Sequence, residues 1–314
     1  MRKAIIISLS GPHLLSNEKI LIKKYKPWGI ILFKRNILDL SQTKNLITTI
    51  RKSAGDKKFP ILIDEEGGTV TRLSNFLDNK IYSQKFFGEL FDTNKKLALG
   101  LYENYLNSIC SVLKIIGFNI NTVPVLDILS KDSHKFISKR SYSKNLNTIR
   151  TLGSLCIDIY NKNKLATIIK HIPGHGPSKV DSHKVLPKIE KSYKNLIKSD
   201  FKCFKNMNSP LAMTAHIQYT KLDNKNVCTH SRHIIGNIIR KKIGYKGIIL
   251  SDDISMKALK FDLVTNAKKS LTAGCNLVLY CGGKYKESLK LIREMPKIDN
   301  FTRKKTSELY KFLS

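Results

Sequence analysis

The segment 170–183, KHIPGHGPSKVDSH, brings together groups that could carry out chemistry: three histidines, an aspartate and lysines, separated by glycine and proline. Such a segment suits a metal site, a phosphate-binding loop or a device for proton transfer. His171 and His175 are four residues apart, but Pro173 and Gly174 between them exclude the helix that would align two metal ligands. The H-x-H pair that usually opens a barrel metallohydrolase is also missing after the first predicted strand. We therefore expect no metal and favour proton transfer.

The same loop and one later strand supply a candidate acid/base and a candidate nucleophile. Asp181 and His183 are two residues apart, and a carboxylate hydrogen-bonded to an imidazole sets its tautomer and raises its basicity. Asp252 lies at the end of a rigid predicted strand and is the candidate nucleophile. Asp253 remains the alternative, because neighbours on a strand point to opposite faces and cannot share the role. A retaining glycosidase needs such a pair across the glycosidic bond.

The elements that must position these groups alternate regularly along the chain. Eight apolar runs predict strands at 4–10, 28–33, 59–64, 118–128, 166–172, 211–217, 247–254 and 275–282. Segments with helical spacing predict helices at 16–24, 41–53, 94–116, 144–162, 191–207, 232–242, 262–273 and 285–294. Eight βα units predict an α/β fold, a (β/α)₈ TIM-type barrel that forms one catalytic domain over residues 1–314. A doubly wound open sheet is the alternative. That fold normally has a Gly-rich phosphate-binding loop after its first strand, and this sequence does not match such a loop there.

Polar side chains follow five of the predicted strands at their carboxyl ends. These side chains are those of Asp64, Asp127, Lys170 with His171, His216 and Asp252. Because the carboxyl ends of barrel strands open on one face, the spacing predicts that these groups surround a single mouth. The sequence leaves the roles of Asp127 and His216 open, because each could either line that mouth or hold a neighbouring residue in place.

Composition limits the partners of the chain. The chain has 56 basic and 24 acidic residues, a net charge of +32, which by itself indicates a polyanion partner. The lysines, however, are spread over most predicted helices and turns without interleaved aromatic residues, so we interpret them as a solvated surface and expect no specific nucleic acid. No apolar run is long enough to insert into a membrane, and the run at 4–9 is shorter than a signal sequence requires. With six cysteines and no C-x-x-C, a cytoplasmic location is expected.

Six segments, read together, resemble one enzyme family. They are ILFKRN (31–36), DEEGGTVTR (64–72), KRSY (139–142), KHIPGHG (170–176), DSH (181–183) and SDDISM (251–256). In this order they are similar to the NagZ-type β-N-acetylglucosaminidases, or β-N-acetylhexosaminidases, of glycoside hydrolase family 3. The resemblance runs from about residue 28 to residue 282. KHIPGHG followed by DSH is its most specific part.

The resemblance implies a mechanism and a substrate. Asp252 would form a covalent glycosyl-enzyme, and His183, held by Asp181, would be the acid/base. The residues implied to bind the sugar are Asp64, Arg72, Arg140, Lys170 and His171. The substrate would be a small muropeptide or amino sugar with a terminal β-linked N-acetylglucosamine. In the best-known members the aglycone is an anhydro-muramoyl peptide and the role is peptidoglycan recycling. We expect a cytoplasmic monomer that needs neither a metal nor an organic cofactor.

Three positions depart from the family pattern and leave the finer substrate preference open. Glu65 replaces a glutamine, Thr69 replaces an arginine, and Lys139 replaces an acidic residue. Glu65 is expected to add a carboxylate near the sugar. Two other classes of protein remain as alternatives: a metal-dependent amidohydrolase and a basic, non-catalytic barrel that binds polyanions. Phosphate as the second nucleophile, which would give phosphorolysis, is a variant of the main hypothesis.

Overall fold

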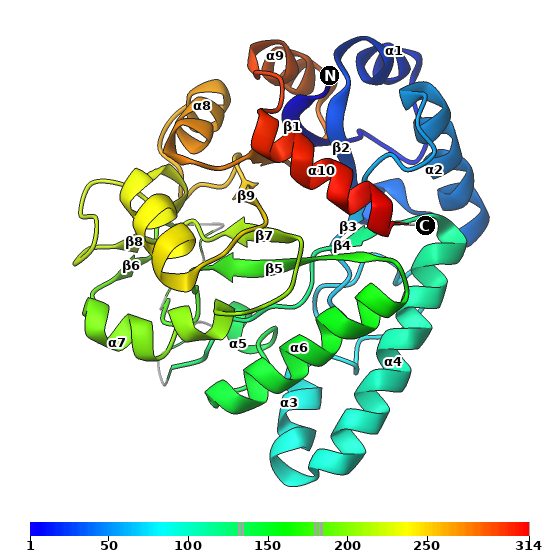
Figure 1. The fold of residues 1–314 in the computed structure, drawn as a ribbon. Helices are drawn as coiled ribbons and strands as arrows, with labels where there is room; N and C mark the ends of the chain where they lie inside the picture. The colour runs from blue at the N-terminus through cyan, green and yellow to red at the C-terminus, as the bar shows by residue number, and fades with distance from the viewer. Residues whose placement is uncertain (131–132, 134, 179, 181, 183–184, 314) are drawn as a thin grey trace.

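The structure, a computed structural model, describes residues 1–130, 133, 135–178, 180, 182 and 185–313. Eight parallel strands close into a barrel in the order β1-β10-β9-β7-β5-β4-β3-β2 (Figure 1). They are β1 (Lys3–Ser8), β2 (Pro27–Leu32), β3 (Ile61–Ile63), β4 (Ile120–Asn121), β5 (Ala166–Ile172), β7 (Leu211–Thr214), β9 (Ile248–Asp253) and β10 (Leu277–Tyr280). Each overlaps one of the eight predicted runs, so the predicted (β/α)₈ barrel is confirmed.

The strands read as continuous apolar runs because both of their faces are buried. Side chains such as Ile6, Leu62 and Leu250 fill the barrel interior, where they form one cluster of buried residues. Their neighbours along the strands, such as Ile5 and Ile63, pack outward against the helices in a second and larger cluster. This alternation buries every strand on two sides, as parallel barrels require.

Helices surround the barrel and mostly follow the predicted pattern. They are α1 (Ser16–Tyr25), α2 (Leu40–Ala54), α4 (Lys95–Ile116), α6 (Leu146–Lys162), α7 (Tyr193–Lys198), η4 (Ile234–Ile243), α8 (Leu263–Ala273) and α9 (Tyr285–Glu294). The predicted helix at 191–207 is wrong in its length, because the chain breaks after α7 and continues as the short η2 (Phe201–Phe204). Asp200 lies at the break, fully buried, where its carboxylate accepts hydrogen bonds from Lys191 and Ser199.

Several elements have no counterpart among the predicted ones. They are α3 (Gln84–Thr93), α5 (Lys135–Ser138), the paired strands β6 (Lys188–Ile189) and β8 (Gln218–Tyr219), the short turns η1 (Lys34–Asn36) and η3 (Cys228–His230), and α10 (Asn300–Phe312). Of these, α10 matters most for the barrel, because it crosses the amino-terminal end of the strands (Figure 1). Leu309 is buried against the interior cluster, and the Trp28 indole N–H donates to the Thr306 hydroxyl at 2.9 Å. Since α10 covers this end, the polar mouth lies at the other end.

We predict that Leu309→Ala destabilises the barrel by about 2–5 kcal/mol, because it leaves a cavity where α10 meets the interior. Leu309 is 3% exposed. The matched control is Leu97→Ala on α4, where the leucine is 54% exposed and the loss should stay below about 1 kcal/mol. The measurement is urea unfolding followed by circular dichroism. Equal losses in the two variants would show that α10 does not support the barrel.

Candidate active site

A cavity of about 380 Å³ opens at the carboxyl ends of the strands. Among the residues that line it are six of the predicted site residues: Asp64, Arg72, Arg140, Lys170, His171 and Asp252. They come from the ends of β3, β5 and β9 and from the loops that follow β3 and α5. The two other predicted residues, Asp181 and His183, lie outside the described residues. Strand ends thus bring together groups that are up to 188 positions apart in the chain, from Asp64 to Asp252.

Lys170 and Asp64 form the centre of a charged network on the cavity wall. The Lys170 ammonium, 2% exposed, donates to Asp64 Oδ1 at 2.5 Å and to the Thr122 hydroxyl at 2.8 Å, and it forms an ion pair with Glu66 at 2.5 Å. Burial by itself would raise the pKa of Asp64, but Lys170 and then Arg72 hold it well below its usual value. Asp64 is therefore a carboxylate with fixed orientation. Such a group can accept hydrogen bonds from sugar hydroxyls.

Glu66 and Arg140 extend this network into the interior. The Arg140 guanidinium donates through Nε and Nη2 to the two oxygens of Glu66, at 2.8 and 2.7 Å, and both side chains are buried. Burial opposes the charge of each group. Even so, Arg140 and Lys170 keep the pKa of Glu66 below its usual value, and Glu66 raises that of Arg140. The pattern DEEGG contains Glu66, but only the barrel shows that this glutamate pairs with two of the predicted sugar-binding cations.

Arg72 lies at the cavity edge, between Asp64 and an aromatic ring. Its Nη2 donates to Asp64 Oδ2 at 2.5 Å, and its guanidinium carbon is 5.2 Å from the centre of the Phe33 ring. Arg72 Nε is buried and has no hydrogen-bond partner among the described residues. A donor of this kind, on a side chain that lines the cavity, can bind an oxygen of a ligand.

His171 is oriented by Asp127, which the sequence left as an open case. Nδ1 of His171 donates to Asp127 Oδ2 at 2.7 Å, because a carboxylate oxygen can only accept. Asp127 Oδ1 also accepts the backbone N–H groups of His171 at 3.3 Å and of His175 at 2.6 Å. Asp127 is fully buried and does not line the cavity. It is therefore a brace that turns the other ring nitrogen of His171 toward the ligand space.

The neighbours Asp252 and Asp253 at the end of β9 have different surroundings. Oδ1 of Asp253 accepts the backbone N–H groups of Ser255 and Cys281, both at 3.1 Å, and Oδ2 accepts the Ser255 hydroxyl at 2.6 Å. Oδ1 of Asp252 accepts the backbone N–H of Asp253 at 2.8 Å. The carboxylate of Asp253 thus links the end of β9 to the segment after β10. Both aspartates line the cavity, and the assignment of Asp252 as the nucleophile stays a prediction.

The three departures from the family pattern lie in different places. Thr69 lines the cavity, whereas Lys139 is exposed and does not. Glu65 is 2% exposed and is also absent from the cavity lining. Its Oε2 accepts the backbone N–H groups of Arg72 and Leu73, at 2.7 and 3.0 Å. The expectation that Glu65 adds a carboxylate near the sugar is therefore wrong, because these bonds turn it into the loop that carries Arg72.

We predict that Glu65→Gln stabilises the protein at pH 7 by about 1 kcal/mol. Burial raises the pKa of Glu65 above 4.5, so the folded state holds this proton more tightly than the unfolded chain. That contribution to stability is present at low pH and is lost as the pH rises through the folded pKa. A glutamine oxygen keeps both backbone bonds, and its N–H₂ takes the place of Oε1, which now accepts from Asn79 Nδ2 at 2.7 Å. With the Asn79 amide turned over, that N–H₂ donates to Asn79 Oδ1, which has no partner among the described residues.

The measurement is the free energy of unfolding of both proteins from pH 4.5 to pH 8. The advantage of Glu65→Gln should grow with pH. Glu66→Gln is the matched control with the opposite sign, because Arg140 and Lys170 lower the pKa of Glu66 and its charge stabilises the fold at pH 7. A Glu65→Gln variant that is less stable than the wild type at pH 8 would contradict the prediction.

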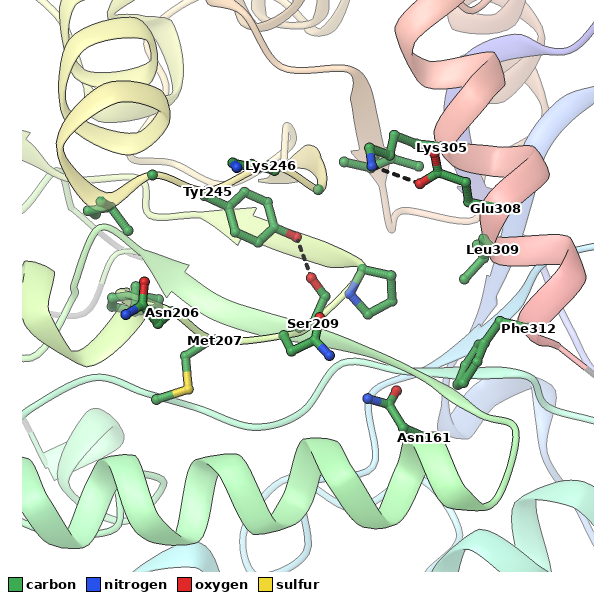
Figure 2. A pocket seen from close by; sticks show the side chains of 17 residues that line it. Asn161, Asn206, Met207, Ser209, Tyr245, Lys246, Lys305, Glu308, Leu309 and Phe312 are labelled. Carbon is green, nitrogen blue, oxygen red and sulfur yellow. Dashed lines mark hydrogen bonds and ion pairs between the residues drawn. The ribbon is translucent and has the colours of Figure 1, made fainter.

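A larger hollow, of about 620 Å³, lies at the opposite end of the barrel. It is bounded by the segments before β7 and β9 and by α10, and Figure 2 shows the Tyr245 hydroxyl donating to the Ser209 carbonyl at 3.1 Å across it. None of the six predicted site residues that the structure describes lines this hollow. Volume alone therefore does not identify the functional site, whereas the clustered charges do. In the described part of the chain, no group of three or more His, Cys, Asp or Glu residues could hold a metal ion.

A closed α/β barrel with a charged cavity at the carboxyl ends of its strands is the arrangement of a barrel enzyme. Residues 7–306 match the family described as Glycosyl hydrolase family 3 N terminal domain. This chain belongs to glycosyl hydrolase family 3. The family resemblance found in the sequence is therefore confirmed, and with it the expected class of enzyme, a glycoside hydrolase.

Individual relatives agree with this membership. A protein named Beta-hexosaminidase from Mannheimia succiniciproducens is 31% identical over 283 residues, which are 88% of this chain and 80% of that protein. The structure of NagZ from Neisseria gonorrhoeae in complex with N-trifluoroacetyl-D-glucosamine matches with a TM-score of 0.88 and 26% identity, over 99% of this chain and 89% of that one. A family 3 β-N-acetylglucosaminidase from a Paenibacillus species has a TM-score of 0.88, over 98% of this chain and 60% of that one. At 24% identity, this last likeness concerns the fold.

Proposed function

We propose that this enzyme removes terminal β-linked N-acetylglucosamine from its substrate with retention of configuration. The observation that carries the proposal is that Asp252, the candidate nucleophile, lines the same cavity as the network of Asp64, Arg72, Arg140 and Lys170. Carboxylates and cations of fixed orientation suit a ligand with many hydroxyls. The names of the relatives, Beta-hexosaminidase and NagZ, support the choice of an amino sugar.

The proposed reaction has two displacement steps. In the first, an Asp252 oxygen attacks the anomeric carbon, the bond to the leaving oxygen breaks, and His183 gives its proton to that oxygen. In the second, His183 takes a proton from water, which attacks the same carbon and releases Asp252. Asp181 would hold the imidazole in the required tautomer. Phosphate in place of water in the second step would give a glycosyl phosphate, which is a variant of the same mechanism.

The finer parts of the proposal concern the substrate and its setting. We expect the aglycone to be an anhydro-muramoyl peptide, the role to be peptidoglycan recycling and the enzyme to act as a cytoplasmic monomer. Among the described helices, none combines the length and apolarity that crossing a bilayer requires. All six cysteines are free thiols, and five of them are buried.

The deciding experiment compares three chromogenic aryl glycosides as substrates of the purified enzyme. We expect turnover of the β-N-acetylglucosaminide, and turnover at least about 100-fold slower of the β-glucoside and of the α-N-acetylglucosaminide. Proton NMR of the first sugar released should show the β-anomer, the mark of retention. Release of the α-anomer first would contradict the two-step mechanism.

The same assay separates the two alternative classes. A polyanion-binding barrel would bind DNA or heparin in low salt and release no aryl group, and a metal-dependent amidohydrolase would lose its activity after treatment with a chelator. Membership of glycosyl hydrolase family 3 favours glycoside cleavage over both. The net charge of +32 still predicts salt-sensitive binding to polyanions in addition to catalysis.

A further inference from the structure

His216 is a fully buried histidine that the proposed mechanism does not use. It follows β7, and its ring makes two hydrogen bonds: Nε2 is 3.0 Å from the backbone carbonyl oxygen of Asp253, and Nδ1 is 2.7 Å from the hydroxyl of Thr229. It does not line the cavity and cannot touch a sugar there. Its bond to Asp253, however, reaches the residue that follows the candidate nucleophile.

The partners of the ring determine its tautomer. A carbonyl oxygen can only accept, so Nε2 carries the hydrogen and donates to Asp253. Burial lowers the pKa of His216, although the Asp252 carboxylate acts to raise it, so the ring is neutral and Nδ1 is an acceptor. The single hydrogen of the Thr229 hydroxyl has two acceptors within reach, His216 Nδ1 at 2.7 Å and the Ala215 carbonyl oxygen at 3.2 Å, and the shorter contact is the one to the ring. The Thr229 hydroxyl can in turn accept from the Thr214 hydroxyl, 2.9 Å away. The result is one directed chain of hydrogen bonds that ends on β9.

This series of hydrogen bonds takes the place of strand pairing that is missing between the ends of β7 and β9. Between β7 and β9 the last paired residues are Met213 and Leu250, so the ladder ends before the two aspartates. On the other side of β9, toward β10, contacts continue: the Ile254 N–H donates to the Leu279 carbonyl at 2.9 Å, and Asp253 accepts the Cys281 N–H. The His216 bond gives the end of β9 an anchor on the β7 side.

We propose that His216 is a positioning residue that holds the end of β9 from the β7 side, so that the carboxylate of Asp252 keeps the angle of attack that the glycosyl transfer requires. This inference rests on the proposed function, because it presumes that Asp252 is the nucleophile. The physical reason is that the rate of nucleophilic attack on carbon depends strongly on the distance and direction of approach. A displacement of about 1 Å can lower the rate about 100-fold. Binding of the sugar by Asp64, Arg72 and Lys170, which stand on other elements, depends little on this anchor.

The test compares kcat, KM and the inhibition constant of N-acetylglucosamine in three variants of the full chain. His216→Leu removes the donor, and we expect kcat to fall about 30-fold while KM and the inhibition constant change less than about twofold. His216→Gln retains an N–H donor on a side chain of similar length and should restore kcat to within about fivefold of the wild type. His230→Gln is the matched control, since the His230 Nε2 atom has no partner among the described residues, and its kcat should not change.

Each result decides the matter. A His216→Leu variant with wild-type kcat overturns the inference, and so does a glutamine variant as slow as the leucine one. If His216→Leu does not fold, Thr229→Val takes its place, because it removes the donor that fixes the ring, and a kcat equal to that of the wild type then overturns the inference. An inactive wild type, by contrast, overturns the proposed function itself and the inference with it. An active wild type with an unimpaired His216→Leu variant overturns the inference alone.

Discussion

Asp252→Asn should lower kcat for an aryl β-N-acetylglucosaminide by on the order of 10⁴-fold, the size of effect that loss of a catalytic nucleophile produces. An amide is nearly the same size as a carboxylate but cannot form the glycosyl-enzyme bond. Because Asp252 is partly exposed at the end of β9, the melting temperature should change by less than about 3 °C. The measurement is steady-state hydrolysis together with thermal unfolding followed by circular dichroism.

Asp253→Asn is the matched control for this prediction, with the same chemical change one residue along the chain. Its carboxylate accepts three hydrogen bonds from Ser255 and Cys281, so the change acts on the contacts between β9 and β10 and not on the attacking carboxylate. We expect a kcat within about tenfold of the wild type. The reverse pattern, with Asp253→Asn inactive and Asp252→Asn active, would transfer the nucleophile to Asp253 and contradict the proposed mechanism.

The second large effect is expected at Lys170. Lys170→Met removes the ammonium that pairs with both Asp64 and Glu66 and leaves two partly or fully buried carboxylates short of a partner. Breaking a buried ion pair from one side typically costs 3–5 kcal/mol, so we predict a loss of about that size at pH 7. Activity should fall at least about 100-fold, because Asp64 loses the contact that fixes its orientation.

The loss should depend on pH in a defined direction. Lys170 helps to hold the pKa values of Asp64 and Glu66 below their usual values, and this stabilisation is present at neutral pH and disappears as the pH falls through the folded pKa values. The gap between wild type and Lys170→Met should therefore be largest at pH 7 and narrow as the pH falls below about 4, the ordinary range of carboxyl pKa values. The control is Lys268→Met, whose exposed ion pair with Glu294 should contribute less than about 1 kcal/mol. A gap that widens toward low pH would contradict the prediction.

Much of the fold was predictable because strand burial is local information. A strand covered on both faces must be apolar along most of its length, so an apolar segment such as 166–172 predicts a strand. The observed strand β5 has those same bounds. The helix α10 escaped prediction for the opposite reason. Its composition is mostly polar, and its buried residues are Thr302, Thr306 and Leu309. In the sequence alone such a segment resembles an exposed tail, because its buried face is defined only by the end of the barrel that it covers.

What the sequence by itself determined is the set of reactive groups and the order of the strands that carry them. Asp64, Lys170, His171 and Asp252 stand directly at the ends of apolar runs, and parallel strands in a closed barrel must deliver such ends to one face. The roles of all eight predicted site residues, Asp181 and His183 among them, stay predictions.

Only the tertiary structure decided which of these groups pair. Asp127 and His216 became braces, Glu65 turned away from the cavity, and Glu66 became the partner of Arg140 and Lys170. The direction of a side chain and its hydrogen-bond partner depend on atoms that can be distant in the sequence, as the separation of 106 positions between Asp64 and Lys170 illustrates. Contacts of that kind arise when the barrel closes, and no local pattern of residue types contains them.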